Sequence, residues 1–220
     1  MIKIKFLEKL LSLIYSRKCF YCGSVKEDKF LCSKCYRKVH FLPPSVLKEI
    51  SGVKVYACAL YDEVIKKLIK DFKYKRKKYL AEVQAQIMFE FFEQLNLKEE
   101  FLVLPVPVHK NRKRERGYNH MDLTAREFSR LSGLKYSSRF LIRVKDTNKQ
   151  FKLHKAERIK NIKDAFGINF YKAPDKSTPL LIIDDITAAG TTLEEIIKLL
   201  KKNGYKNISA LVLSTPDIWN

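Results

Sequence analysis

The sequence predicts an α/β protein: a parallel sheet with helices on both faces, preceded by a small cysteine-rich module. Residues 180–184 (LLIID) and 208–214 (ISALVLS) are apolar runs of strand length, and a helical pattern at 191–204 lies between them. Strands that are apolar throughout and alternate with helices are typical of a parallel sheet that is covered on both faces. Four cysteines in two close pairs precede this pattern. A chain of 220 residues has room for one main domain and such a module.

Residues 1–16 (MIKIKFLEKLLSLIYS) predict an amphipathic helix, because the isoleucines and leucines fall at helical spacing. Glu8 and Lys9 interrupt the apolar run and no small-residue cleavage site follows, which argues against a secretory signal peptide. No stretch approaches the roughly 18 consecutive apolar residues that span a bilayer. We therefore expect a cytoplasmic protein whose first helix packs on its own chain, with membrane-surface binding as the alternative.

The cysteine module has the spacing C-x2-C-x9-C-x2-C, formed by Cys19, Cys22, Cys32 and Cys35. Two close thiolate pairs can each bind one side of a tetrahedral ion, and Gly23 gives the turn the backbone freedom it needs. The pattern predicts zinc, in a structural role because four cysteine ligands leave no open coordination position. Disulfides or a redox pair are the alternative, and they fit poorly in a reducing cytoplasm. Cys58, in an apolar stretch, is expected to be an inert core residue.

Pro43 and Pro44 mark the predicted end of this module, because consecutive prolines end regular structure. We divide the chain there into a module at 1–44 and a main domain at 45–220. The remaining predicted elements are helices at 62–73, 77–97 and 119–132, the last ending at Gly133, and strands at 101–108 and 140–144.

The chain is strongly basic: 44 lysines and arginines against 24 acids give a formal net charge of +20. This balance predicts attraction to polyanions such as nucleic acid, anionic lipid or phosphorylated ligands. Basic residues gather at 73–78, 110–116 and 143–163. Each run alone is more often a solvated face than a binding site, so nucleic-acid binding and solvation both stay open. The DNA-binding candidates are Lys73, Lys75, Arg76, Arg112, Arg114 and Arg116.

Two adjacent acids, Asp184 and Asp185, end an apolar strand and precede ITAAGTT and a helix. Ligands of open parallel sheets bind beyond the carboxyl ends of the strands. The N–H groups at a helix start favour a phosphate, small residues allow it to approach, and Thr191 and Thr192 add hydroxyl donors. Because carboxylates accept hydrogen bonds from sugar hydroxyls, the pattern predicts a ribose 5-phosphate site. The alternative is a helix cap, which needs one acid and no apolar strand ahead of it.

The run LLIIDDITAAGTT at 180–192 resembles the phosphoribosyl pyrophosphate (PRPP) binding motif of type I phosphoribosyltransferases. The rest of the chain resembles one branch of that superfamily, the ComF family of bacterial competence proteins. VLPVPVHKNRKRERGYNH at 103–120 matches the family's valine–proline run, histidine and spaced arginines. The cysteine module is also typical of the family. A further pattern is matched through Arg143, Thr147, Gln150, Arg158 and Asn161.

The resemblance implies a type I phosphoribosyltransferase fold that binds PRPP. Asp184 and Asp185 would bind the ribose hydroxyls and would be the catalytic acids if PRPP is turned over. Magnesium is implied because the diphosphate and ribose oxygens would chelate it. Residues 146–158 look like the mobile loop that closes over PRPP in active relatives. The other implied PRPP contacts are Pro107, Val108, His109, Arg158, Thr187, Ala188, Ala189, Gly190, Thr191 and Thr192.

One departure concerns Ala188 and Ala189, which stand where relatives usually carry two threonines. Two hydroxyl donors to phosphate are lost, at roughly 1.5–3 kcal/mol per hydrogen bond to a charged group. We expect PRPP binding that is weakened but not abolished, and the departure puts turnover in question more than binding.

The resemblance further implies a role in natural transformation, in moving incoming single-stranded DNA through the inner-membrane step. Partners would then include competence proteins at that membrane, and the chain could lie at its cytoplasmic face. Two alternatives remain. One is an active phosphoribosyltransferase with an unidentified acceptor, and the other is a zinc-containing nucleic-acid scaffold whose PRPP site is degenerate.

Overall fold

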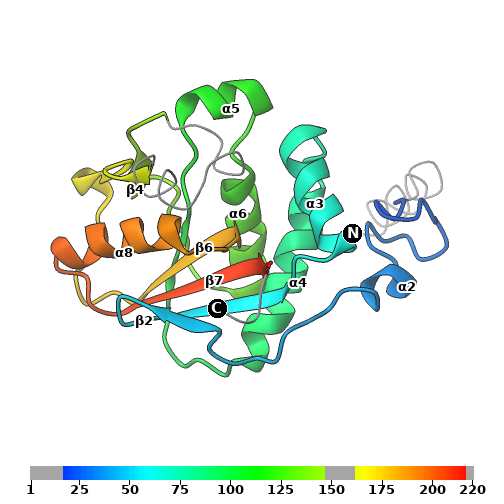
Figure 1. Ribbon diagram of the computed structural model, residues 1–220, viewed down its shortest axis with the longest axis horizontal. Coiled ribbons are helices and arrows are strands. Elements are labelled where there is room, and N and C mark those ends of the chain that lie inside the picture. Colours follow the sequence, from blue (N-terminus) through cyan, green and yellow to red (C-terminus); the bar gives the residue numbers. More distant parts are fainter. Residues whose placement is uncertain (1–16, 147–161, 217–220) are drawn as a thin grey trace, which may run out of the picture.

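A five-stranded sheet forms the centre of the protein (Figure 1). The computed structural model describes residues 17–146 and 162–216, so the predicted helix at 1–16 and nearly all of the expected loop at 146–158 lie outside the described residues. The strands are β1 (Lys48–Ile50), β2 (Val53–Leu60), β3 (Leu102–Pro105), β6 (Leu180–Ile186) and β7 (Ile208–Thr215). Their order is β1-β2-β7-β6-β3, with β1 antiparallel to β2 and all other neighbours parallel. The parallel strands therefore end at one shared carboxyl edge.

Helices cover both faces of this sheet, as predicted (Figure 1). One face carries α3 (Glu63–Tyr74), α4 (Leu80–Gln94) and α6 (His120–Ser132). The other carries α8 (Thr191–Lys202) and a two-stranded sheet of β4 (Leu141–Arg143) and β5 (Phe166–Ile168). The short elements are α2 (Ser33–Tyr36), α5 (Lys110–Arg116) and the 3-10 helix η2 (Phe170–Lys172). The predicted α/β class, a mostly parallel sheet after a cysteine module, is confirmed.

Strand β6 shows why the central strands are apolar throughout. Leu181 and Ile183 pack in the core under α3, α4 and α6, whereas Leu180 and Ile182 pack in the core under α8. Side chains alternate between the two faces of a strand, so a strand covered on both faces needs apolar residues at every position. The same alternation sends neighbouring side chains at the end of β6 to opposite faces of the sheet.

The predicted helices of the main domain are confirmed, and their ends have local causes. Helix α3 begins after Asp62, whose carboxylate accepts the Ile65 N–H at 2.9 Å. Helix α6 ends at Gly133 as predicted, because this residue takes the left-handed conformation (φ 75°) that closes a helix. The helix expected from residue 77 begins later, at Leu80. The strands β1, β2 and β5 and the short helix α5 were not predicted.

The cysteine module packs against α4. The ring centroids of Phe30 and Tyr79 lie 4.4 Å apart, and the Tyr36 hydroxyl donates to the Glu90 carboxylate. Cys58 lies in β2 and is fully buried, as predicted for a core residue. None of the helices in the described ranges is long and apolar enough to cross a membrane.

Candidate functional site

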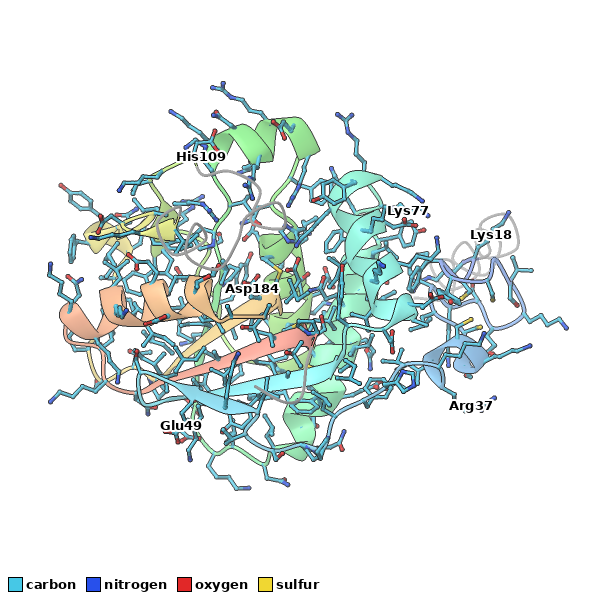
Figure 2. The ribbon with its side chains drawn as sticks, viewed as in Figure 1. Lys18, Arg37, Glu49, Lys77, His109 and Asp184 are labelled. Carbon is cyan, nitrogen blue, oxygen red and sulfur yellow. The ribbon has the colours of Figure 1, made fainter. Side chains whose placement is uncertain are left out.

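Asp184 and Asp185, the acid pair, line a pocket at the carboxyl edge of the sheet. This pocket has a volume of about 330 Å³. Figure 2 shows Asp184 at the end of β6, below α5, with His109 at the start of that helix. The pocket is built from the ends of several elements, as expected for a parallel sheet. Its lining includes Lys73, Arg76, Pro107, Val108, Arg112, Arg116, His120, Arg143, Asp184, Asp185 and Thr192.

The two acids differ in their surroundings because they point to opposite faces of the sheet. Asp185 points toward α3 and α6 and is 2% exposed, with its Oδ2 atom 2.5 Å from Lys73 Nζ and 2.8 Å from His120 Nε2. Burial alone would raise the pKa of Asp185, but Lys73 and His120 outweigh it and hold the pKa below its ordinary value. This carboxyl is therefore a fixed anion at neutral pH.

Asp184 is the titrating member of the pair. Its Oδ1 accepts the backbone N–H of Asp185 at 2.9 Å. Burial, together with the neighbouring negative charge of Asp185, raises its pKa to about 7. A carboxyl with this pKa holds a proton about half of the time at pH 7. Lys73 and Arg143 both favour its ionised form.

A small-residue loop joins β6 to α8 beside the acids. Residues 187–190 line a second, smaller cavity together with the start of α8. Gly190 has a φ of 76°, which strains any residue with a side chain, and an added Cβ would lie 2.6 Å from Ile50 Cδ1 and force that side chain to move. The Thr187 hydroxyl is buried and has no hydrogen-bond partner among the described residues. The N–H groups of the helix start and this hydroxyl can donate hydrogen bonds to a phosphate.

The loop is supported from behind by β1, a contact that the sequence did not indicate. Lys48 Nζ donates to the carbonyl oxygen of Ala188 at 2.8 Å. Burial lowers the pKa of Lys48. The lysine therefore fixes the position of this loop carbonyl.

The DNA-binding candidates have different environments. Four of them, Lys73, Arg76, Arg112 and Arg116, line the pocket with the acid pair. Lys75 instead pairs with buried Asp71 at 2.9 Å, and Lys67 and Lys77 also contact this aspartate. Arg114 is exposed and is not in the pocket lining. The structure therefore brings most of these cations to the predicted PRPP site.

The residues predicted around PRPP are also placed unevenly. Pro107 and Val108 line the pocket, but the His109 ring caps α5 by accepting the Asn111 N–H at 3.3 Å. Thr192 lines both cavities, whereas Thr191, Ala188, Ala189 and Gly190 line only the smaller one. Arg158 lies outside the described residues.

Sequence reasoning missed His120 and gave Arg143 no role in the site. Arg143 lines the pocket near Asp184, and burial lowers its pKa to about 10, so it stays charged at neutral pH. His120 follows the Asn119 cap at the start of α6 and reaches Asp185. A useful signal was available: two acids that point to opposite faces of a covered sheet need a partner in each layer.

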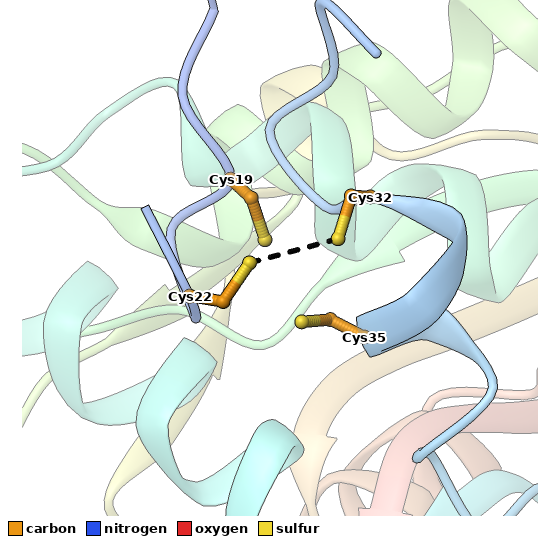
Figure 3. Close-up of side chains that lie close together, drawn as sticks. All are labelled: Cys19, Cys22, Cys32 and Cys35. Carbon is orange, nitrogen blue, oxygen red and sulfur yellow. Dashed lines mark hydrogen bonds between the residues drawn. The ribbon is translucent and has the colours of Figure 1, made fainter. Parts of the chain in front are cut away.

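The four cysteines of the module converge (Figure 3). All four sulfur atoms lie within 4.8 Å of one another, and Cys22 and Cys32 Sγ are 3.7 Å apart. Four sulfurs at about 2.3 Å from a tetrahedral zinc would be separated by about 3.8 Å, so the donor set fits zinc. Burial raises the pKa of the Cys32 and Cys35 thiols, so four thiolates here require a cation. The predicted cysteine cluster is confirmed.

A larger cavity, of about 540 Å³, lies between this module and α4. Several of its polar groups pair with one another: Arg17 pairs with Glu82 at 3.2 Å, and Glu90 accepts from Tyr36 and Gln86. We therefore place the functional site at the acid pair, where charged groups converge on open space.

The chain is similar in sequence to three groups of named bacterial proteins. Competence protein F of Haemophilus influenzae is 29% identical over 197 residues, which covers 86% of this chain and 81% of the relative. The chain is a homologue of competence protein F. Competence protein ComFC of Bacillus subtilis is 26% identical, over 89% of this chain and 76% of the relative. DNA utilization protein YhgH of Escherichia coli K12 is 27% identical, over 84% of this chain and 85% of the relative. No family model matches the chain.

Among solved structures, adenine phosphoribosyltransferases align with this chain. The enzyme from Trypanosoma brucei has a TM-score of 0.41 at 11% identity, over 85% of this chain and 80% of the enzyme. The enzyme from Leishmania tarentolae has a TM-score of 0.38 at 13% identity, over 71% of this chain and 77% of the enzyme. The fold class stated above rests on the sheet order and the two covered faces.

Proposed function

We propose that the chain is a PRPP-binding, phosphoribosyltransferase-like protein that supports uptake of single-stranded DNA in natural transformation. The observation that carries the PRPP proposal is the acid pair, which lies between a small-residue phosphate loop and a wall of arginines. The role in transformation is supported by similarity to relatives named competence protein F and ComFC. In this proposal the protein works in the cytoplasm, beside competence proteins of the inner membrane.

The three parts of the site correspond to the three parts of PRPP. The loop at 187–190 and the start of α8 would take the 5-phosphate, with Thr187 supplying a buried hydroxyl. Asp184 and Asp185 would accept hydrogen bonds from the ribose hydroxyls. Arg112, Arg116 and Arg143 line the same pocket and would face the diphosphate. This division follows from charge: acids suit a diol, and cations suit phosphates.

Magnesium would enter with the ligand, because diphosphate and ribose oxygens are the ligands that it prefers. When bound, it would neutralise charge on the diphosphate. The chain itself contributes three kinds of charged group at fixed positions. These are the ionised carboxylate of Asp185, the titrating carboxyl of Asp184, and the arginines that line the same pocket.

The proposal predicts that PRPP with magnesium stabilises the protein against heat. Ligand at 100 times its dissociation constant adds about 2.7 kcal/mol of stability, which corresponds to a rise of roughly 5–10 °C in Tm for a chain of this size. Ribose 5-phosphate should give a smaller rise in Tm, because it has no diphosphate to bind Arg112, Arg116 and Arg143. Thermal unfolding monitored with each ligand makes this measurement. An unchanged Tm with saturating PRPP, together with no heat of binding in calorimetry, would refute the proposed function.

We further propose that single-stranded DNA binds at the pocket mouth, through Arg76 and Arg112. Because these arginines line the pocket of the acid pair, PRPP and DNA should compete for them. We expect saturating PRPP with magnesium to weaken binding of a fluorescent oligonucleotide severalfold. Replacing Arg112 by Ala should weaken DNA binding and lower the salt slope by about 1. A DNA affinity that does not change when PRPP is added would show that the two ligands use separate surfaces.

The control for this prediction is Arg114→Ala, because Arg114 lies on the same short helix but outside the pocket lining. Its DNA affinity should respond to PRPP as the wild type does. An equal loss of DNA binding in the Arg112 and Arg114 variants would point to a diffuse basic face and not to a shared pocket.

A further inference from the structure

A buried chain of hydrogen bonds connects the two walls of the pocket. Asp185 Oδ2 contacts both Lys73 Nζ, at 2.5 Å, and His120 Nε2, at 2.8 Å. On the other side of the imidazole ring, His120 Nδ1 lies 3.0 Å from Arg116 NH1. His120 is 4% exposed and its ring packs edge-on against Phe72, with ring centroids 5.8 Å apart. A histidine therefore stands between an acid of one wall and an arginine of the other.

The protonation state of His120 follows from these contacts. Burial lowers its pKa to about 4, although Asp185 opposes the shift, so the ring is neutral at pH 7. A neutral ring has one N–H, and only a donor can face a carboxylate that is already ionised. Nε2–H therefore donates to Asp185, and Nδ1 accepts from the Arg116 guanidinium. Each nitrogen of the ring has one defined role.

We propose that His120 and Lys73 are positioning residues of the acid pair. They keep the Asp185 carboxylate ionised and fix its orientation, and His120 connects it to Arg116 through hydrogen bonds. This inference rests on the proposed function, because the pair is taken as the ribose site of PRPP. It also reassigns Lys73, which the basic run at 73–78 suggested as a DNA contact. The side chain of Lys73 is only 19% exposed and its ammonium group contacts Asp185.

The arrangement separates the roles of the two acids. Asp185 has its charge compensated before any ligand arrives, and its position is fixed from α3 and α6. Asp184 has no ion pair with any described residue, and its pKa is raised to about 7. The other groups that face the acids are Tyr61 after β2, Arg143 on β4 and Arg112 on α5. Lys73 and His120 contact the Asp185 carboxylate directly, so these two are the groups to test.

The test compares two pairs of variants. His120→Phe keeps the ring but removes both hydrogen bonds, whereas His120→Gln can still donate to Asp185 and accept from Arg116. Lys73→Met removes the ammonium group, and Lys73→Arg keeps a cation. PRPP with magnesium is titrated into each protein by calorimetry between pH 6 and pH 9. Results are compared with the wild type at each pH, because the ligand's own phosphate also titrates near pH 6.

We expect His120→Phe and Lys73→Met to lose roughly tenfold or more in PRPP affinity at pH 7. The loss should shrink as the pH rises, because these variants leave Asp185 with a raised pKa and alkali restores its charge. His120→Gln and Lys73→Arg should stay within about threefold of the wild type. A defect that only disturbed packing would show neither recovery at high pH nor rescue by the conservative variant.

Three outcomes would overturn the inference. Folded His120→Phe and Lys73→Met proteins that bind PRPP like the wild type would show that the network does not matter. Losses that are equal at every pH and are not rescued by Gln or Arg would assign the two residues a scaffolding role. A wild-type protein that binds no PRPP at any pH would overturn the proposed function itself, and this result is distinct from the other two.

Discussion

Asp184→Asn is expected to leave the protein as stable as the wild type, or more stable, while PRPP affinity falls by at least about tenfold. The amide has the shape of the carboxyl but cannot accept two sugar hydrogen bonds as an anion, and a lost hydrogen bond to a charged group costs roughly 1.5–3 kcal/mol. Stability should not suffer, because the substitution removes like-charge repulsion from Asp185. Calorimetry with PRPP and magnesium, and urea unfolding of the same protein, measure the two effects.

The pH dependence of the difference in stability has a defined sign. The pKa of Asp184 is raised from an ordinary 3.8 to about 7 in the folded protein. The folded state therefore keeps a proton that the unfolded chain releases between these values, and the wild type loses stability as the pH rises through this window. The stability of Asp184→Asn relative to the wild type should thus increase from about pH 4 to pH 7. A relative stability that falls over this range would contradict the assignment.

Asp185→Asn is the matched comparison, with the opposite expected effect on folding. Asp185 has a lowered pKa, so its ion pair stabilises the fold above pH 3.8 and this contribution is lost only as the pH falls below that value. Replacing Asp185 by Asn leaves the Lys73 ammonium group without its partner, and breaking a buried pair costs about 3–5 kcal/mol. Equal stabilities for the two variants at pH 7 would show that the two acids are not differentiated.

The sequence was most informative where one residue pattern had one physical explanation. Apolar strands followed by acids and a small-residue loop predicted both the covered parallel sheet and the position of the pair at its carboxyl edge. The spacing of the cysteines predicted their cluster. Short elements such as α5 and β5 were not predictable, because so few residues carry no periodicity and depend on tertiary packing.

The surroundings of the acids were harder to predict, because a basic run does not show which cation points inward. Lys73 looked like part of a solvated charge cluster, yet it continues the buried stripe of α3 at Ile65 and Ile69 with a spacing of four. That this stripe points toward the end of β6 can be inferred only when the strand order is known. His120 was equally hidden, because its partner Asp185 is 65 residues away in the chain.

The loop departure at Ala188 and Ala189 also has a clearer meaning in the structure. Two hydroxyls are absent, but Gly190, the buried Thr187 hydroxyl and the helix start remain at the cavity. The Lys48 contact with the Ala188 carbonyl further fixes the loop. The donors that remain are mostly backbone groups, which no side-chain substitution removes, so the structure is compatible with a weakened phosphate site that still binds.

Removal of zinc is expected to have the largest effect on the N-terminal module. We expect one zinc ion per chain by mass spectrometry, and Cys35→Ser should lose it, because three thiolates and a hydroxyl hold zinc far more weakly. Structural zinc contributes of order 10 kcal/mol in small zinc peptides, so the segment from Cys19 to Val39 should lose hydrogen-exchange protection. Unfolding of this segment would also remove the packing of Phe30 on Tyr79, so the Tm should fall as well.

The control for this experiment is Cys58→Ala, which removes a thiol from the same chain at a buried site away from the metal ligands. It should keep the full zinc content and lose only the stability of a small core truncation. Because the module contacts α4 and none of its described residues lines the pocket, Cys35→Ser should still bind PRPP below its Tm. Full zinc content in Cys35→Ser would rule out the four-cysteine site, and lost PRPP binding in a folded variant would show that the module supports the pocket.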